Sequence, residues 1–224
     1  MFLLATIVVL SYLVGSIPTS IIVTKFARGI DIREYGSGNA GGTNVMRVLG
    51  WKQGLFVILL DALKGVVVVV FIARLHYGSM PFTNETPFDD LTLIQIIAGV
   101  SAVVGHIWTV FAGFKGGKGI ATALGMLLMI STIYMLIAIG VFVVVVTISR
   151  YVSLGSILGA IAVPLILFIR ENIFNVHIAN YNTIFPFVIL ISMIVIFTHR
   201  KNVVRLINGN ESKLSFSKKK KTTL

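Results

Sequence analysis

Cysteine is absent from the 224 residues, which excludes disulfides and thiolate-ligated metal sites. Histidine is scarce as well. Its positions, 76, 106, 177 and 199, offer no pair at the spacing that ligates a metal from one helix face. The sequence therefore indicates neither a protein-bound metal centre nor any other cofactor.

Charged residues are also few. Asp, Glu, Lys and Arg make up 12% of the chain, whereas 56% of the residues are hydrophobic and the mean hydropathy is +0.96. Soluble domains carry about twice that charged fraction, roughly 25%. Too little polar surface remains to cover a water-facing globule, so the lipid bilayer is expected to be the main solvent of this protein.

Long apolar runs predict membrane-spanning helices, each of which needs about 20 apolar residues. The runs lie at 2–24, 54–74, 91–112, 132–149, 154–170 and 184–198. The first run has neither the basic start nor the small-residue cleavage site of a signal peptide, so we expect it to be retained as a span. No internal repeat of the kind found in many transporters is evident.

The positive charge is concentrated in short segments, which predicts how the chain crosses the membrane. The net charge is +11, and every Lys and Arg except Lys64, Arg74 and Arg170 lies within 25–52, 115–118, 150 and 200–221. Basic loops face the cytoplasm. This arrangement accounts for the positive charge by topology, without a nucleic acid partner.

The segment between Lys118 and Arg150 decides the number of spans. For both residues to lie on one side, the chain must cross twice, through a short helix at about 120–130 and a full one at 132–149. We therefore expect an all-α integral membrane protein of seven transmembrane helices, one of them short, with its N-terminus outside and its C-terminus cytoplasmic. Residues 1–211 would form a single bundle and 212–224 a disordered basic tail that suits anionic lipid.

A glycine-rich loop, GSGNAGGTN at residues 36–44, precedes Arg47. Glycines allow backbone N–H groups to converge on an anion, and Ser, Thr and Asn add neutral donors. Arg47, in the first turn of the helix that follows, would add a charged donor. A flexible linker is the plainer alternative, but it does not explain this composition. The loop is predicted to bind phosphate through Gly36, Ser37, Gly38, Asn39 and Arg47.

A second glycine-rich segment, GFKGGKGIAT at residues 113–122, begins a helix whose N-terminal N–H groups suit a phosphate. Its candidate ligands are Gly116, Gly117, Lys118 and Gly119. The segment is not a Walker A motif, because Gly119 follows Lys118 and no strand precedes it. His106 lacks an acidic residue five positions later, so a packing role for it is as acceptable as a catalytic one.

The third group is spread over two segments, RYVSLGS at 150–156 and HRKNVVR at 199–205. Ser153 and Ser156 share a helix face, and one of them is expected to bind ligand, although a helix-capping role would also explain a serine there. His199 and Asn202 have the same spacing. Asp61 and Lys64 lie inside a span, where ionisable residues either serve function or neutralise each other.

These motifs, in this order from Gly15 to Glu211, resemble those of the bacterial acyl-phosphate:glycerol-3-phosphate acyltransferases. The resemblance implies seven membrane helices and a cytoplasmic-face active site in the bacterial plasma membrane. It implies acyl transfer from acyl phosphate to the 1-hydroxyl of glycerol 3-phosphate, giving lysophosphatidic acid and phosphate, the first acylation of phospholipid synthesis. An acyl-phosphate-forming enzyme is an implied partner.

The resemblance also implies roles by position. Ser37, Lys118, His199 and Asn202 would take part in catalysis. Substrate binding would fall to Gly36, Gly38, Asn39, Arg47, Gly116, Gly117, Gly119 and one or both of Ser153 and Ser156. Two other classes remain as alternatives: a transporter of phosphate-bearing anions, and a transferase for nucleotide-activated lipid. Missing repeats count against the first, and the lack of a metal-binding acid cluster counts against the second.

Overall fold

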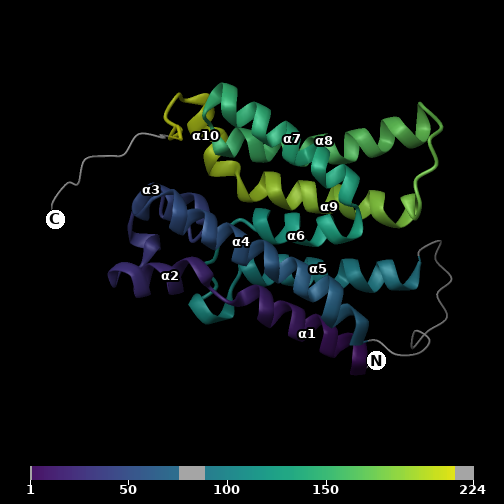
Figure 1. Cartoon of the computed structure of the whole chain (residues 1–224), viewed down its shortest axis with the longest axis horizontal. Coiled ribbons are helices and arrows are strands. Elements are labelled where there is room, and N and C mark those ends of the chain that lie inside the picture. The colour runs from purple at the N-terminus through teal and green to yellow at the C-terminus, as the bar shows by residue number, and fades with distance from the viewer. Residues whose placement is uncertain (1, 76–88, 215–224) are drawn as a thin grey trace.

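The computed structural model describes residues 2–75 and 89–214, and these residues form helices without any strand (Figure 1). The α-helices are α1 (Phe2–Ser16), α2 (Thr19–Arg28), α3 (Gly42–Leu49), α4 (Trp51–Val67), α5 (Asp90–Ile107), α6 (Ile120–Ile130), α7 (Thr132–Ser149), α8 (Val152–Asn172), α9 (Tyr181–Thr198) and α10 (Arg200–Ile207). A π-helix, Val68–Ile72, extends α4, and short 3-10 turns occupy Ile32–Glu34, Ala73–Leu75 and Val110–Ala112.

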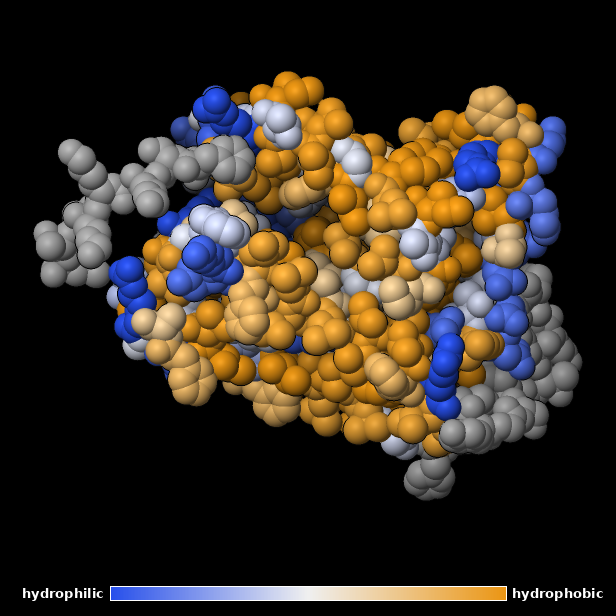
Figure 2. All heavy atoms as spheres, in the orientation of Figure 1, coloured by the Kyte–Doolittle hydropathy of each residue, from blue (hydrophilic) through white to orange (hydrophobic). Residues whose placement is uncertain are grey.

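Six described stretches are long and apolar enough to cross a membrane. They are Leu3–Arg28, Trp51–Leu75, Asp90–Ala112, Thr132–Ser149, Val152–Asn172 and Tyr181–Thr198, with Ile120–Ile130 as a shorter apolar helix. Figure 2 shows hydrophobic side chains over the middle of the visible face and hydrophilic ones toward its two ends. The prediction of an all-α integral membrane protein is confirmed. The seventh crossing and the orientation of the termini stay predictions.

The first span is divided in two. The sequence predicted a span over 2–24, but α1 ends at Ser16 and α2 begins at Thr19. Pro18 explains the break, because it has no N–H to donate and disfavours the helical conformation at Ile17. The carbonyl of Ile17, released by this break, accepts a hydrogen bond from Lys64 Nζ at 2.5 Å.

Glycines bring pairs of helices into close contact, as is common between membrane helices. A Cβ on Gly15 of α1 would lie 2.1 Å from the Ala102 carbonyl oxygen of α5. A Cβ on Gly125 of α6 would lie 1.9 Å from the Ala62 carbonyl oxygen of α4. These contacts fix α5 beside α1 and α6 beside α4, which determines where the polar ends of α5 and α6 meet.

The elements that carry the polar motifs gather at one end of the bundle. Helices α2, α3 and α10 lie at the left in Figure 1, opposite the N-terminus. Most of the expected basic tail falls outside the described residues. Of the part that is described, Ser212 accepts a hydrogen bond from Arg47 Nη2 at 3.3 Å, and the Leu214 N–H donates to the Arg150 carbonyl at 2.7 Å.

Candidate active site

A cavity of about 530 Å³ lies among α3, α4 and α6 to α10. On the face shown in Figure 2, a hollow separates the α3–α4 side from the α7–α8 side. The structure brings into its wall predicted site residues from all three motifs: Ser37, Gly38, Asn39, Arg47, Lys118, Ser153, Ser156, His199 and Asn202. Four predicted ligands do not line it: Gly36, Gly116, Gly117 and Gly119.

Asn44 organises the first loop from within. Its Nδ2 donates to the carbonyls of Ile32, Tyr35 and Asn39 at 3.1, 2.9 and 3.1 Å, and its Oδ1 accepts the Ser37 N–H at 2.8 Å. The side chain is 2% exposed. Side-chain bonds of this kind hold a loop in a non-helical shape. The sequence suggested Asn44 as one more donor to a ligand, but its side chain is already hydrogen-bonded within the loop.

The start of α3 supplies the free donors that the loop was predicted to contain. A Cβ on Gly42 would lie 2.4 Å from Ile58 Cγ1, so glycine lets the end of α3 rest directly on α4. Gly41, Gly42 and Thr43 line the cavity. The first N–H groups of a helix have no partner within it and carry the positive end of its dipole. This end of the cavity therefore favours an anion.

The second loop uses its glycines for packing. The N–H groups of Gly116 and Gly117 donate to the carbonyls of Ile107 and His106, each at 3.0 Å. A Cβ on Gly116 would lie 2.0 Å from the His106 carbonyl oxygen. Gly119, with φ +80°, instead turns the chain into α6. The prediction that Gly116 and Gly117 offer N–H groups to phosphate is wrong in this structure, because both groups are already paired.

Lys118 is the part of this loop that reaches the cavity. Its Nζ donates to Asn202 Oδ1. Burial lowers the pKa of Lys118 to about 8, and the nearby Arg205 and Arg47 add to this effect although Glu211 opposes it. The cation is therefore only partly solvated and close to other positive groups, an arrangement that an incoming anion would relieve.

Glu211 ties the last segment to the site, a role that the sequence analysis missed. Its Oε1 accepts from Asn202 Nδ2 at 2.7 Å and from Ser153 Oγ at 2.8 Å, and its Oε2 accepts from Arg205 Nε at 2.8 Å. Burial alone would raise the pKa of Glu211, but these hydrogen bonds hold it below its ordinary value. The available signal was that Glu211 is the one acidic residue after position 198.

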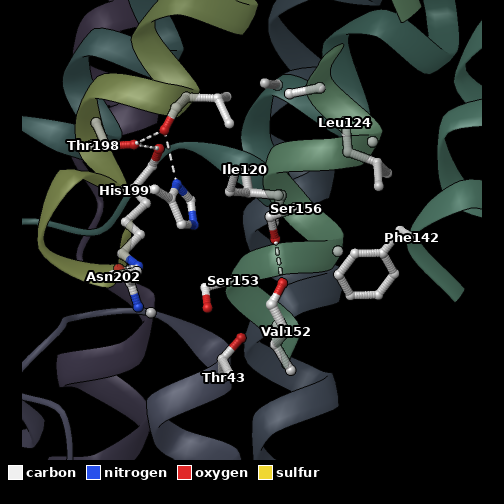
Figure 3. A pocket seen from close by; sticks show the side chains of 18 of the residues that line it. Thr43, Ile120, Leu124, Phe142, Val152, Ser153, Ser156, Thr198, His199 and Asn202 are labelled. Carbon is white, nitrogen blue, oxygen red and sulfur yellow. Dashed lines mark hydrogen bonds between the residues drawn. The ribbon is translucent and has the colours of Figure 1, made fainter. Parts of the chain in front are cut away.

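His199 presents a neutral imidazole to the cavity (Figure 3). Its Nδ1 lies 2.8 Å from the Val195 carbonyl, which can only accept, so Nδ1 carries the proton and Nε2 is an acceptor. Burial, followed by the charge of Lys118, lowers the pKa of His199 to about 4. The ring is 2% exposed. Such a histidine can orient a hydroxyl group but is a weak base.

Arg47 and the two serines complete the polar end. Arg47 Nε is buried and has no hydrogen-bond partner among the described residues, and burial lowers the pKa of this guanidinium. Ser156 Oγ donates to the Val152 carbonyl of its own helix at 3.0 Å, and Ser153 Oγ donates to Glu211 (Figure 3). Both serines line the cavity, and each donates its one hydroxyl hydrogen within the protein.

The cavity continues away from its polar end as an apolar arm between α6, α7, α8 and α9. The arm is lined by Leu124, Leu127, Met135, Ala138, Ile139, Phe142, Val143, Gly159, Ala160, Val163, Val188, Ile191 and Val195. From His199 to Val188 along α9, the helical rise of 1.5 Å per residue gives a depth of about 16 Å. One cavity therefore offers cations and N–H donors at one end and hydrocarbon contacts along the rest.

Two groups that the sequence left undecided also line the cavity. Asp61 forms an ion pair with Lys64 at 2.7 Å, so the expected mutual neutralisation occurs, yet Asp61 still contributes to the cavity wall. His106 does as well, with its Nδ1 3.5 Å from Asp61 Oδ1. No spacing in the sequence indicated this pairing, because the two residues lie on different helices.

Comparison with known proteins gives a consistent result. Residues 5–209 match the family described as "Glycerol-3-phosphate acyltransferase". The chain is 49% identical to the glycerol-3-phosphate acyltransferase of Chlorobaculum tepidum and 48% identical to that of Chlorobaculum parvum, each over 95% of this chain and 97% of the relative.

This chain is also similar to two crystal structures of PlsY (YgiH), an integral membrane glycerol 3-phosphate acyltransferase. The glycerol 3-phosphate form has a TM-score of 0.79 at 34% identity, over 95% of this chain and 96% of that one. The lysophosphatidic acid form has a TM-score of 0.77 at 33% identity, over 95% of each chain.

Proposed function

The chain belongs to the glycerol-3-phosphate acyltransferase family, and from this premise we propose that it transfers an acyl group from acyl phosphate to the 1-hydroxyl of glycerol 3-phosphate. The family resemblance drawn from the loop motifs is confirmed, as is the assignment to membrane acyltransferases of phospholipid synthesis. The products are lysophosphatidic acid and inorganic phosphate, which makes this the first acylation of the synthesis.

The observation that supports the proposal is the continuity of the polar end with the apolar arm. An acyl phosphate has the same two parts, an anionic head and a long hydrocarbon chain. The arm would hold the chain while the head lies among Lys118, Arg47 and the start of α3. Arg47 Nε, which is buried and has no partner in the described part of the chain, would gain a phosphate oxygen, and this removes the cost of an unsatisfied donor.

The chemistry follows from these positions. The 1-hydroxyl oxygen attacks the acyl carbon, the bond from that carbon to the phosphate oxygen breaks, and phosphate leaves with the electron pair. Fixed cations and N–H donors stabilise the negative charge that develops on the oxygens. His199 Nε2 accepts a hydrogen bond from the hydroxyl and aligns it for attack. The transfer is direct, and no acyl-enzyme forms.

The hydroxyl proton ends on a substrate phosphate. The pKa of His199 is lowered to about 4, whereas the second pKa of a phosphate group is roughly 6. Phosphate is therefore the stronger base of the two. Trapping a covalent acyl-serine during turnover would contradict this direct mechanism.

The orientation in the membrane is part of the proposal. The basic segments, the cavity mouth and α10 would face the cytoplasm of a bacterial cell, with α6 as the short seventh crossing. An acyl-phosphate-forming enzyme would then supply the donor from that side. Thiol-accessibility labelling of single cysteines introduced at Phe26 and Ile173, in a chain with no native cysteine, tests this: only the cysteine at 26 should react from the cytoplasmic side.

The reaction is tested with the purified protein in detergent, palmitoyl phosphate and radiolabelled glycerol 3-phosphate. Lysophosphatidate and inorganic phosphate should appear in equal amounts, with no product when palmitoyl-CoA or palmitoyl-acyl carrier protein replaces the donor. Product from the thioesters alone would overturn the donor assignment. Absence of product with every donor would favour the transporter alternative, since transport makes no new covalent bond.

A further inference from the structure

A buried polar cluster lies beside the phosphate-binding end and has no part in the reaction described above. It consists of Thr19, Asp61, Lys64 and His106, which are 8%, 2%, 6% and 8% exposed. Three groups approach a single oxygen, Asp61 Oδ1: the Thr19 hydroxyl, Lys64 Nζ at 2.7 Å and His106 Nδ1 at 3.5 Å. The cluster therefore saturates one side of this carboxylate.

The other side of the cluster is open. Within residues 2–75 and 89–214, nothing donates to Asp61 Oδ2 and nothing bonds to His106 Nε2, and both residues line the cavity. Two acceptors on one cavity wall that lack a partner among these residues mark a place where a ligand can donate hydrogen bonds. The Gly117 backbone packs against His106, and glycine is needed there because a Cβ would lie 2.2 Å from His106 Nε2.

The chemistry of the two free atoms defines what they bind. A carboxylate oxygen only accepts hydrogen bonds, and a neutral imidazole that donates from Nδ1 to a carboxylate has Nε2 left as an acceptor. Lys64 already balances the charge of Asp61. The subsite therefore suits an uncharged hydrogen-bond donor, a hydroxyl group, and it repels the phosphate that Arg47 and Lys118 attract.

The position of the subsite matches the shape of the acceptor. Asp61 follows Ile58 by about one helical turn on α4, and the start of α3 rests on Ile58 through Gly42. One turn is about 5 Å. A phosphate at the start of α3 therefore has Asp61 within reach of a hydroxyl on its own short carbon chain.

We propose that Asp61 Oδ2 and His106 Nε2 form a subsite that accepts hydrogen bonds from the 2-hydroxyl of glycerol 3-phosphate. Holding the 2-hydroxyl fixes the rotation of the carbon chain and turns the 1-hydroxyl toward His199. Thr19 and Lys64 pair with the other oxygen, Asp61 Oδ1, and stabilise the cluster on the side away from the acceptor. This inference rests on the proposed function and adds to it the means by which the acceptor is selected.

The test compares two acceptors in two forms of the full-length enzyme. With the wild type, 1,3-propanediol phosphate, which lacks the 2-hydroxyl, should give kcat/KM 10- to 100-fold lower than glycerol 3-phosphate, the range for a hydrogen bond to a charged group. Asp61→Asn should lower kcat/KM for glycerol 3-phosphate by a similar factor. For the deoxy acceptor, kcat/KM of the variant should be almost the same as that of the wild type. If Asp61 acted in folding alone, Asp61→Asn would lower kcat/KM equally for both acceptors. The ratio of the two kcat/KM values would then stay as in the wild type, which would overturn the proposal.

Two more variants keep the result decisive. His106→Asn leaves the Asp61–Lys64 ion pair intact and should also reduce the preference, by about tenfold, even where Asp61→Asn does not fold. Thr19→Val removes a bond on the saturated side, so it should lower thermal stability and leave the acceptor ratio unchanged. Failure of the wild type to acylate either acceptor would refute the proposed function itself, whereas wild-type activity with unchanged ratios in both variants would refute only this subsite.

Discussion

The two glycine-rich loops look alike in sequence and do different things in the structure. The first loop folds around Asn44 and places Gly41, Gly42 and Thr43, at the start of α3, in the cavity wall. The second loop pairs its Gly116 and Gly117 N–H groups with the end of α5, and of its residues 113–119 only Lys118 lines the cavity. In the proposed function, the first loop would bind phosphate mainly through backbone N–H groups and the second through the single cation of Lys118. The predictions that follow test this difference.

The largest effect is expected at Lys118. Lys118→Ala should lower kcat/KM by about 10²- to 10³-fold, the usual cost of removing a preorganised group that stabilises developing negative charge. Thermal stability should change little, because Lys118 makes one side-chain bond, to Asn202. Steady-state kinetics and thermal unfolding in the same detergent measure both. A comparable loss of stability would show that the second loop needs Lys118 for packing.

The next effect concerns the first loop. Asn44→Ala removes the acceptor of the Ser37 N–H and the donors to three carbonyls. The free energy of unfolding should fall by about 3 kcal/mol, since each buried group left unpaired costs about 1–3 kcal/mol. The KM for glycerol 3-phosphate should rise because α3 loses its support. Asn39→Ala is the control, because the Asn39 side chain forms no hydrogen bond within residues 2–75 and 89–214. It should leave the unfolding temperature near that of the wild type, and an equal drop would contradict the special role of Asn44.

A matched pair of glycine variants sharpens the comparison. In Gly117→Ala the new Cβ would meet His106 Nε2 at 2.2 Å, so the second loop or His106 must move, at about 1–3 kcal/mol of stability. In Gly38→Ala the nearest atom would be 3.4 Å away, and only the positive φ of +72° opposes the change, at about 1 kcal/mol. The unfolding temperature of Gly117→Ala should therefore be lower than that of Gly38→Ala. The reverse order would mean that the second loop is the more adaptable of the two.

The smallest effect is the pH dependence that the second loop confers. The pKa of Lys118 is lowered to about 8, so its charge is present below that pH and lost above it. The pH profile of kcat/KM reports the free enzyme, and it should fall about tenfold per unit above pH 8. The substrate phosphate, with a second pKa of roughly 6, keeps its charge in this range. Lys118→Arg keeps its charge throughout, so its profile should be flat there; a flat wild-type profile would contradict the assignment.

Much of the fold could be predicted because its determinants are local in the sequence. Apolar runs such as 132–149 and 184–198 correspond closely to α7 and α9, and charge counting between Lys118 and Arg150 separated α6 from α7. Pro18 was visible too, yet its effect on the first span was not predicted, since many membrane helices tolerate proline.

The sequence indicated which residues form the site, but not which other residues they bond to. His199, Asn202 and Lys118 were identified by residue type and motif. The bond from the Gly117 N–H to the His106 carbonyl depends on how the chain turns back after α5, and the bond from Ser153 to Glu211 joins segments 58 residues apart. Composition shows that donors are present, but only the packing of α5 against the second loop decides which of them are already used.

The cavity wall draws on the chain from Ser37 to Glu211, so it has a consequence for biogenesis. The early helices bring in the predicted anion-binding residues Arg47 and Lys118. The imidazole of His199, the amide of Asn202 and the carboxylate of Glu211 belong to the segments that are synthesised last. A nascent chain still held by the ribosome at residue 198 would be embedded in lipid and unable to react. Catalysis therefore begins only after synthesis has passed this point, and a prematurely terminated chain would not acylate anything.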